Sequence, residues 1–307
     1  MIVDQLYAQL EQQGLKGRVV SIRHLHELEQ DIKGRQSQNL FDSNFYRERL
    51  DFFEFHTPDE LFSSLSLIIV AMPRPQTRVT FTWSGKTLSL ILPPTYWKYQ
   101  RISSHIMDRL KKILAPEGYH VTLANLPLKT LAVRSRLGAY GRNNICYVPG
   151  MGSFLQLAAC YSDFPCAEDD WQAPTMMDRC QKCLACLRKC PTQAITSERF
   201  LLHAERCIVF HNERGISRTL PDWLDLSSHD CLFGCMVCQR FCPEDTRFLG
   251  WFEGNEEFNQ EETNWFLQGF TNGQLPYATV EKLERLELSE DLEVLSRNLK
   301  VLFHVNK

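Results

Sequence analysis

Apolar residues recur at helical spacing in several stretches of the first 175 positions. Amphipathic patterns over 4–13, 24–33 and 102–114 each predict a helix with one buried face. In the third stretch, the residues that share this face are Ile102, Ile106, Met107, Leu110 and Leu114. A further pattern over 128–138 predicts a helix that Gly138 ends as its cap.

Short runs rich in β-branched and aromatic residues lie between these helices and predict strands. The run at 64–73 is almost continuously apolar and ends at a proline, as expected of a buried strand. The alternating runs at 78–83 and 86–92 flank Ser84–Gly85, which predicts a hairpin. Further strands are predicted at 17–22, 119–124, 143–149 and 153–162. Because strands alternate with helices, we expect an α/β or α+β domain over residues 1–175.

The composition is that of an ordinary globular protein. The chain has 307 residues, of which 44% are hydrophobic and 23% charged, with a net charge of −3. The charge is close to neutral and no long basic run occurs, which argues against a general nucleic-acid binder. No apolar run approaches the roughly 18 residues of a membrane span, and the amphipathic start does not resemble an export signal. We therefore expect a cytoplasmic protein without a membrane partner.

Twelve cysteines need an explanation, because structural disulfides are rare in the reducing cytoplasm. Eight of them form two arms that end in Cys-Pro. The first arm is "CQKCLACLRKCP"; the second, "CMVCQRFCP", lacks a first cysteine, which "AERCIVF" can supply. In two-cluster ferredoxins, the fourth cysteine of such an arm ligates the other cluster. The spacing therefore predicts two 4Fe–4S clusters in a ferredoxin-like module at residues 176–248.

Each predicted cluster takes three ligands from one arm and one from the other. The ligands of cluster one are Cys180, Cys183, Cys186 and Cys242. The ligands of cluster two are Cys207, Cys235, Cys238 and Cys190. Cys231 is the alternative to Cys207, but its four-residue step to Cys235 departs from the usual spacing. Structural zinc is the alternative to the clusters, although a zinc site has no use for two crossing arms.

Two segments flank this module. The 175 residues before it are more than a simple electron carrier needs, so we expect them to form a separate functional domain. After it, residues 249–307 contain one or two amphipathic helical patterns. Positions 251–307 hold eleven acidic and five basic side chains. We expect a short acidic helical tail that repels the phosphates of a nucleic acid.

The order of several motifs resembles that of one known family. The stretch "SRLGAYGRNNICYVPGMGSFLQLA", then "CQKCLACLRKCPTQAI", "AERCIVF" and "GCMVCQRFCPED", is similar to the cobalamin-dependent epoxyqueuosine reductases over about residues 60–245. The resemblance implies an oxidoreductase that holds base-off cobalamin between the N-terminal domain and the cluster module. It also implies an external electron donor of the flavodoxin or ferredoxin type. The implied substrate is the epoxide of a modified base in tRNA, which is reduced to an alkene.

The same resemblance assigns residues to the corrin ring. The positions whose backbone is implied to face it are Leu137, Gly138, Gly141, Arg142, Asn143, Gly152 and Ser153. From the residues alone, the alternative is that these glycines end a helix and close a hairpin. The carboxylate general acid of the family falls near Thr122, yet no Asp or Glu lies between Gly118 and Gly150. His120 and Tyr140 are the candidate proton donors in its place.

Three functions remain open at this point. The first is an authentic reductase with a nonstandard proton donor. The second is a divergent relative that reduces another substrate, or the corrinoid of a partner protein. The third is a dicluster electron-transfer protein whose N-terminal domain is only a docking scaffold. A corrin spectrum distinguishes the third function from the other two.

Overall fold

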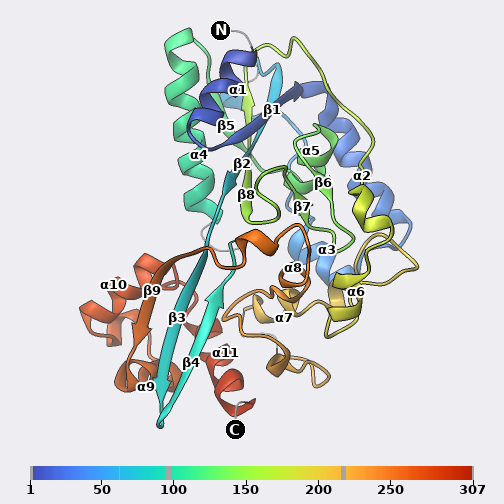
Figure 1. Ribbon diagram of the computed structural model, residues 1–307. Helices are drawn as coiled ribbons and strands as arrows, with labels where there is room; N and C mark the ends of the chain where they lie inside the picture. The colour runs from blue at the N-terminus through green and yellow to red at the C-terminus, as the bar shows by residue number, and fades with distance from the viewer. Residues whose placement is uncertain (1–2, 62, 95–98, 216–218, 306–307) are drawn as a thin grey trace.

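The N-terminal half of the chain builds a four-stranded sheet between two layers of helices (Figure 1). The computed structural model describes residues 3–61, 63–94, 99–215 and 219–305. The sheet has the order β1 (Lys16–Ser21), β2 (Ser66–Pro73), β8 (Leu155–Ser162), β5 (Val121–Ala124). All of its neighbouring strands are antiparallel. The domain is therefore of the α+β kind within the predicted fold class.

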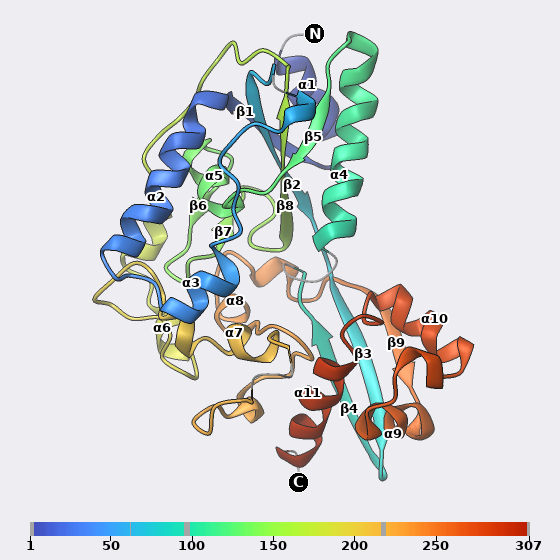
Figure 2. The same cartoon turned by 180° about the vertical axis from the view of Figure 1, so that it is seen from behind.

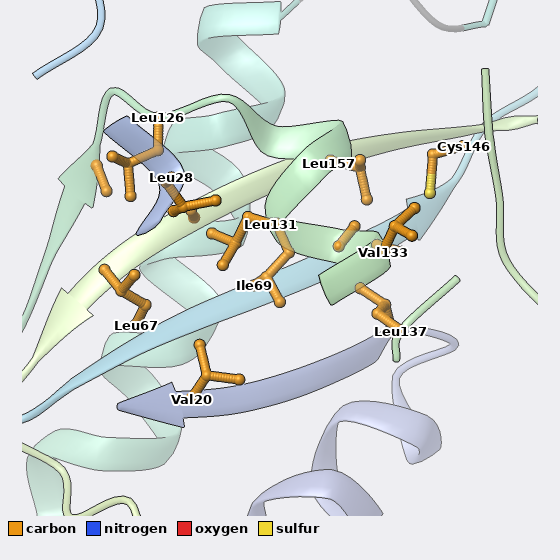
Figure 3. Close-up of a cluster of buried hydrophobic side chains, with 14 of the residues drawn as sticks. Val20, Leu28, Leu67, Ile69, Leu126, Leu131, Val133, Leu137, Cys146 and Leu157 are labelled. Carbon is orange, nitrogen blue, oxygen red and sulfur yellow. The ribbon is translucent and has the colours of Figure 1, made fainter. Parts of the chain in front are cut away.

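Helices cover both faces of this sheet because β2 is apolar on both sides. Ile68 and Val70 face a core that includes residues of α1 (Val3–Gln12) and α4 (Tyr99–Leu114). Leu67 and Ile69 face the opposite core, which α2 (Leu25–Ser37) and α5 (Leu128–Arg134) complete. Figure 3 shows Leu28, Leu131 and Val133 with the side chains of β2 and β8 in this second core. Such double-sided burial explains why the 64–73 run lacks polar alternation.

The predicted helices at 4–13, 24–33 and 102–114 and the predicted hairpin are confirmed. At the hairpin turn, Ser84 and Gly85 have φ angles of 51° and 73°, as a two-residue turn between twisted strands requires. The expected cap at Gly138 is wrong. Helix α5 already ends at Arg134, and Arg136 adopts the left-handed conformation with φ 58°.

The segment after α5 is less regular than the sequence suggests. The predicted strand at 143–149 is reduced to β7 (Cys146–Tyr147), which pairs with the equally short β6 (Ala139–Tyr140). Gly138 is needed where the two strands meet, because a Cβ there would lie 2.5 Å from the Tyr147 carbonyl oxygen. The glycine therefore serves close backbone packing instead of a helix end.

A third unit combines the hairpin with the C-terminal segment (Figures 1 and 2). Strand β3 (Gln76–Trp83) pairs with β4 (Lys86–Leu92) on one side and, in parallel, with β9 (Phe252–Phe258) on the other. The helices of the unit are α9 (Gln260–Gln268), α10 (Tyr277–Leu286) and α11 (Leu292–Val305). They share one apolar core with the hairpin, in which Phe81 stacks on Phe258 at 5.1 Å. The predicted C-terminal helices are present, but a strand precedes them and joins the segment to the hairpin.

The cluster module lies between these two units and has little regular structure. Its helices are α6 (Ala185–Lys189), α7 (Ile208–Asn212) and α8 (Val237–Arg240), and α3 (Ser43–Arg49) of the N-terminal domain lies beside it. Backbone hydrogen bonds of Ile91 with Asp230 and Leu232 attach it to β4. Within the described part of the chain, no helix is long and apolar enough to cross a bilayer.

Candidate iron–sulfur and cofactor site

The residues predicted for cluster one lie together at the start of α6 and after α8. Burial raises the pKa of the Cys186 thiol to about 11, and the thiols of Cys180, Cys242 and Cys183 raise it further. The guanidinium of Arg142 donates two hydrogen bonds to the Cys180 carbonyl oxygen, of 2.8 and 3.2 Å, and so fixes this loop. The structure thus brings one cysteine of the second arm to three of the first. Such thiols need a cation to stabilise their thiolate form.

The residues predicted for cluster two surround an enclosed cavity. Cys190, Cys207, Cys235 and Cys238 all line it. Burial raises the pKa of Cys207 to about 12, with further contributions from Cys235 and Cys190. In the described part of the chain, no three His, Cys, Asp or Glu side chains converge as the ligands of one ion would. The ligands of a 4Fe–4S cluster bind different irons and need not converge on one point, so this donor set fits the cluster.

Cys231, the alternative ligand, lies outside this cavity. Its side chain is fully buried in a small apolar cluster with Phe154 and Met236. Its backbone N–H donates a 3.1 Å hydrogen bond to Nδ1 of His229. Cys231 therefore has a packing role in the folded chain, whereas Cys207 opens onto the space that the other three cysteines share.

His229 makes folding stability depend on pH. Burial lowers its pKa from 6.5 to about 4, and its Nδ1 must stay unprotonated to accept from Cys231. A depressed histidine pKa destabilises the fold as the pH falls below 6.5, because the unfolded chain binds the proton more tightly. Between pH 7.5 and 5.5, we expect the native protein to lose about 1 kcal/mol more of its free energy of unfolding than His229→Asn does. The raised pKa values of Glu213 and Asp245 act in the opposite direction in both proteins and cancel in this comparison. Anaerobic urea unfolding measures this difference. His229→Asn keeps an acceptor that does not titrate, so the same pH dependence in the native protein and in this variant would contradict the assignment.

Lys129 is a residue that the spacing of the cysteines did not reveal. It lies in the first turn of α5 and lines the cluster-two cavity. Desolvation lowers its pKa and Cys146, Cys207 and Cys238 act in the opposite direction, although part of the side chain remains exposed. A cation near two predicted ligands is suited to stabilise the negative charge of a cluster. Lys129 reaches the cluster ligands only because the fold places α5 against the module. The sequence alone therefore does not indicate this role of Lys129.

A larger cavity, of about 790 Å³, lies between the N-terminal domain and the module; we call it the interdomain cavity. Its size is within the roughly 300–1,000 Å³ range of small-molecule sites. Residues that line it include Gly138, Ala139, Tyr147, Gly150, Gly152, Met177, Pro243, Glu244 and Arg247. Pro243 and Glu244 directly follow Cys242, so this cavity adjoins cluster one.

Two of the seven residues that the resemblance assigned to the corrin, Gly138 and Gly152, line the interdomain cavity. Gly152 has φ 58°, and a Cβ there would lie 2.4 Å from Oδ1 of Asp245. Asp245 also accepts hydrogen bonds from the backbone N–H of Ser153, at 2.7 Å, and from its hydroxyl, at 2.6 Å. Ser153 is fully buried. The close packing of this turn against the module therefore accounts for both residues, whatever the cavity binds.

The other assigned residues lie in the segment 137–143, which packs against the loops that hold the predicted cluster ligands. Leu137 is buried in the core of the domain. Gly141 packs against Asn143 and Tyr147. Asn143 lines the cluster-two cavity, and its hydrogen bond opposes the burial that raises the pKa of Cys238. Together with Arg142, it links this stretch to one predicted ligand of each cluster.

Tyr147 connects the interdomain cavity with cluster one. The ring lines the cavity, and Asn143 Nδ2 donates to its hydroxyl at 3.0 Å. Burial raises the pKa of Cys242, and a hydrogen bond with the Tyr147 hydroxyl opposes this rise. One aromatic side chain therefore spans the wall between a predicted cluster ligand and the cavity. No pattern in the sequence indicates this role.

His120 does not lie at the cavity, and its predicted catalytic role is withdrawn. Its Nδ1 pairs with Oδ2 of Asp163 at 2.8 Å, and its side chain is 74% exposed. Asp163 lies just after the C-terminal end of β8, whereas Gly152 and Ser153 lie before its N-terminal end. Because β8 is extended, its eight residues separate the two sites by roughly 25 Å.

Tyr140 faces away from the interdomain cavity, so its predicted role as a proton donor there is also withdrawn. Its hydroxyl hydrogen-bonds Thr130 at 2.9 Å, and burial raises its pKa to about 12. The preceding residue, Ala139, lines the interdomain cavity instead. Consecutive residues of a strand point to opposite faces, which explains the difference. The described lining of the cavity offers Tyr147 and Glu244 as groups that can carry a proton; Glu244 pairs with Arg179 at 2.8 Å.

The cysteine arms match a known domain family. Residues 179–245 correspond to the 4Fe-4S double cluster binding domain. This match covers all eight predicted ligands and the loops that hold them. The segment is therefore a binding domain for two 4Fe–4S clusters, and the zinc alternative is not retained.

Curated relatives extend the similarity beyond this domain. The chain is 28% identical over 157 residues to the epoxyqueuosine reductase of Synechococcus sp. (strain CC9605), which covers 49% of this chain and 47% of the relative. It is 30% identical over 130 residues to that of Synechocystis sp. (strain ATCC 27184 / PCC 6803 / Kazusa), covering 42% and 43%. This chain resembles the epoxyqueuosine reductases. It spans about half the length of the curated relatives it matches.

Solved epoxyqueuosine reductase structures show the same fold. The enzyme from Streptococcus thermophilus aligns with a TM-score of 0.67 and 17% identity, over 100% of this chain and 82% of that one. An epoxyqueuosine reductase with an epoxyqueuosine-modified tRNA-Tyr stem loop also gives 0.67, with 18% identity, over 98% of this chain and 82% of the other. The alignment covers the whole chain, so the third unit belongs to the shared fold.

Proposed function

We propose that this chain is an iron–sulfur reductase that passes electrons through its two clusters to cobalamin in the interdomain cavity. The observation that carries this proposal is the position of Tyr147, which lines the cavity and hydrogen-bonds a predicted ligand of cluster one. The adjoining residues Pro243 and Glu244 also line the cavity. A group bound there would lie next to cluster one, as short-range electron transfer requires.

In this proposal, the clusters are held by the eight cysteines of the two arms. Cluster one takes Cys180, Cys183, Cys186 and Cys242, and cluster two takes Cys190, Cys207, Cys235 and Cys238. Arg142 holds the Cys180 loop, and Asn143 hydrogen-bonds the Cys238 thiol. Both residues limit the rearrangement of the ligands when a cluster changes charge.

The interdomain cavity suits cobalamin by its position beside cluster one and by the main chain in its wall. Main chain at Gly138, Gly150 and Gly152 lines the cavity. A Cβ at Gly150 would meet nothing closer than Nζ of Lys16 at 3.5 Å, so the backbone there is open to the close approach of a flat ring. Its described lining includes no histidine, in keeping with a corrin that needs no protein ligand below the metal. When bound, cobalamin would supply the strongly reducing centre that opens an epoxide.

We propose an epoxide as the substrate class, and the epoxide of a modified tRNA base as the first to test. Its reduction to an alkene consumes two electrons and two protons and releases water. The relatives and the solved complex with a tRNA stem loop support this choice. In the proposed site, Tyr147 and Glu244 are the groups placed to hold a proton beside the cavity. A flavodoxin- or ferredoxin-type donor in the cytoplasm is the proposed electron source.

The first test is an anaerobic absorption spectrum of the reconstituted protein, with and without cobalamin, together with an iron count. We expect about eight irons and a base-off corrin band that comigrates with the protein. Eight irons without corrin binding would reject the cobalamin reductase and leave a dicluster electron carrier. If corrin binds but tRNA that carries the epoxide does not, the substrate proposal is rejected and a divergent reductase remains.

Ala139→Trp tests whether the interdomain cavity is the corrin site. The indole would occupy part of the cavity that Ala139 lines, so we expect corrin binding to fall at least about tenfold with a normal iron count. Leu123→Trp is the matched control, because Leu123 is an exposed residue of β5 away from the cavity. Equal corrin binding by the Ala139→Trp variant and the native protein would place the corrin elsewhere.

A further inference from the structure

A second pocket lies on the opposite side of β6 from the interdomain cavity. Tyr140 lines this pocket, whereas Ala139 lines the cavity. Its volume is about 350 Å³, within the range of small-molecule sites. We call it the aromatic pocket, after the phenylalanines in its walls: Phe41, Phe45, Phe53, Phe200 and Phe210.

The aromatic pocket is closed by contacts between α3 and the cluster module. The guanidinium of Arg214 pairs with the carboxylate of Glu48, with Nε 2.8 Å from Oε2. The rings of Phe45 and Phe210 meet edge to face at 5.4 Å. Despite these contacts, α3 has no fully buried residue. Its inner face therefore borders open space and not a packed core.

Two charged side chains that line this pocket, Glu213 and Lys129, form no ion pair in the described part of the chain. Oε1 of Glu213 is buried without a hydrogen bond. Lys129 also lines the pocket, and no hydrogen bond or ion pair of its ammonium group is found in the described part of the chain. Burial raises the pKa of Glu213 to about 7, and the guanidinium of Arg49, which also lines the pocket, opposes this rise. The Lys129 side chain is exposed, so the buried and unsatisfied group is the Glu213 oxygen; such groups are rare in folded proteins and point to a ligand that satisfies them.

The aromatic pocket adjoins cluster two. Cys207 and Lys129 line both the pocket and the cluster-two cavity. The interdomain cavity adjoins cluster one, through Tyr147 and Pro243. The two clusters therefore lie between two separate cavities, one at each end of the electron path. A ligand in the aromatic pocket is placed to deliver electrons to cluster two.

We propose that the aromatic pocket binds the planar ring system of a flavin, which reduces cluster two. The phenylalanine rings would pack against the apolar part of the flavin. Its ring N–H would donate to the carboxyl group of Glu213, and its ring carbonyl and nitrogen acceptors would face the ammonium of Lys129. A purely apolar ligand would leave the Glu213 carboxyl group unsatisfied.

The electrons and protons of this step balance. A reduced flavin that is oxidised loses two electrons and two protons. Each 4Fe–4S cluster accepts one electron, so the two clusters together take both, and the protons pass to solvent at the mouth of the pocket. This role rests on the two clusters of the proposed function but not on cobalamin. The binding step can therefore be tested whether or not the corrin binds.

The test is a titration of cluster-loaded protein with riboflavin under anaerobic conditions, followed by isothermal calorimetry and by quenching of flavin fluorescence. We expect saturable binding of one flavin per chain. Glu213→Leu removes the acceptor and should weaken binding at least about tenfold, because hydrogen bonds to charged groups contribute strongly. Glu213→Gln keeps an acceptor oxygen and should restore most of the affinity. Glu198→Leu, at an exposed carboxylate of the module, is the matched control.

Replacement of an unsatisfied carboxyl group by leucine should not unfold the protein, and the iron count of each variant checks this. Leu50→Trp, which fills the pocket from the end of α3, should abolish binding independently of Glu213. In addition, photoreduced riboflavin should reduce the clusters of the native protein faster than those of the Glu213→Leu variant. No saturable binding to the native protein, or equal binding by both leucine variants at position 213 and 198, would overturn the proposal.

Discussion

A Cys207→Ser variant is expected to lose about half of its iron, from roughly eight to roughly four irons per chain. Cys207 opens onto the cavity that Cys190, Cys235 and Cys238 also line. A serine at this position removes one thiolate of cluster two, and the three remaining ligands should not retain the cluster during purification. The measurements are the iron and sulfide content and the electron paramagnetic resonance spectrum of the reduced protein.

Cys231→Ser is the matched control, since Cys231 stands nearer in sequence to the second arm. Its side chain is buried against Phe154 and Met236. The new hydroxyl should cost about 1–3 kcal/mol of stability but leave the iron content unchanged. If Cys231→Ser lost the iron and Cys207→Ser kept it, the ligand set proposed for cluster two would be wrong.

Asp245→Ala is expected to lower the free energy of unfolding by about 3 kcal/mol. Asp245 is fully buried, and its carboxyl group accepts from both the backbone N–H and the hydroxyl of Ser153. Gln239 of α8 donates in turn to the Ser153 hydroxyl at 2.8 Å. Alanine would leave the Ser153 N–H buried without a partner. The same variant should release iron from cluster one to a chelator faster, because Cys242 lies three residues before Asp245.

Two substitutions serve as controls for this prediction. Asp245→Asn keeps one acceptor oxygen for Ser153 and should lose about half as much stability. Glu244→Ala removes only the partner of Arg179, in a largely exposed ion pair, and should change stability by less than about 0.5 kcal/mol. Equal urea midpoints for the Asp245→Ala variant and the native protein would show that this network does not hold the module to the domain.

The parts of the site that are local in sequence could be predicted from the sequence. The spacing of the cysteines within each arm is visible in the sequence. From this spacing, Cys242 of the second arm is expected to join the three first-arm ligands of cluster one. The turn at Ser84–Gly85 could be predicted for the same reason, since two residues determine it. Helix α4 was predicted because five apolar positions repeat along one face.

The end of the sheet at which a residue lies, and the face to which its side chain points, could not be predicted from the sequence in the same way. His120 is near the missing carboxylate in sequence and Tyr140 lies in the glycine-containing stretch after it, but the direction of a strand takes the first to the far end of β8. The alternation of side chains turns the second to the opposite face of β6. Lys129 and Glu213 are 84 positions apart and meet in one pocket only because α3 and α5 pack on the module. No local pattern encodes such a contact.

The third unit has a consequence for the order in which the chain can fold as it is made. Its hairpin is complete at residue 92, but β9 begins only at residue 252. At typical synthesis rates, the ribosome needs on the order of ten to thirty seconds for the intervening 160 residues. During this time Val79, Phe81 and Leu90 lack the covering strand and helices that bury them in the finished protein. Both cysteine arms emerge within this interval, so the clusters can be inserted while the scaffold on either side of them is still open.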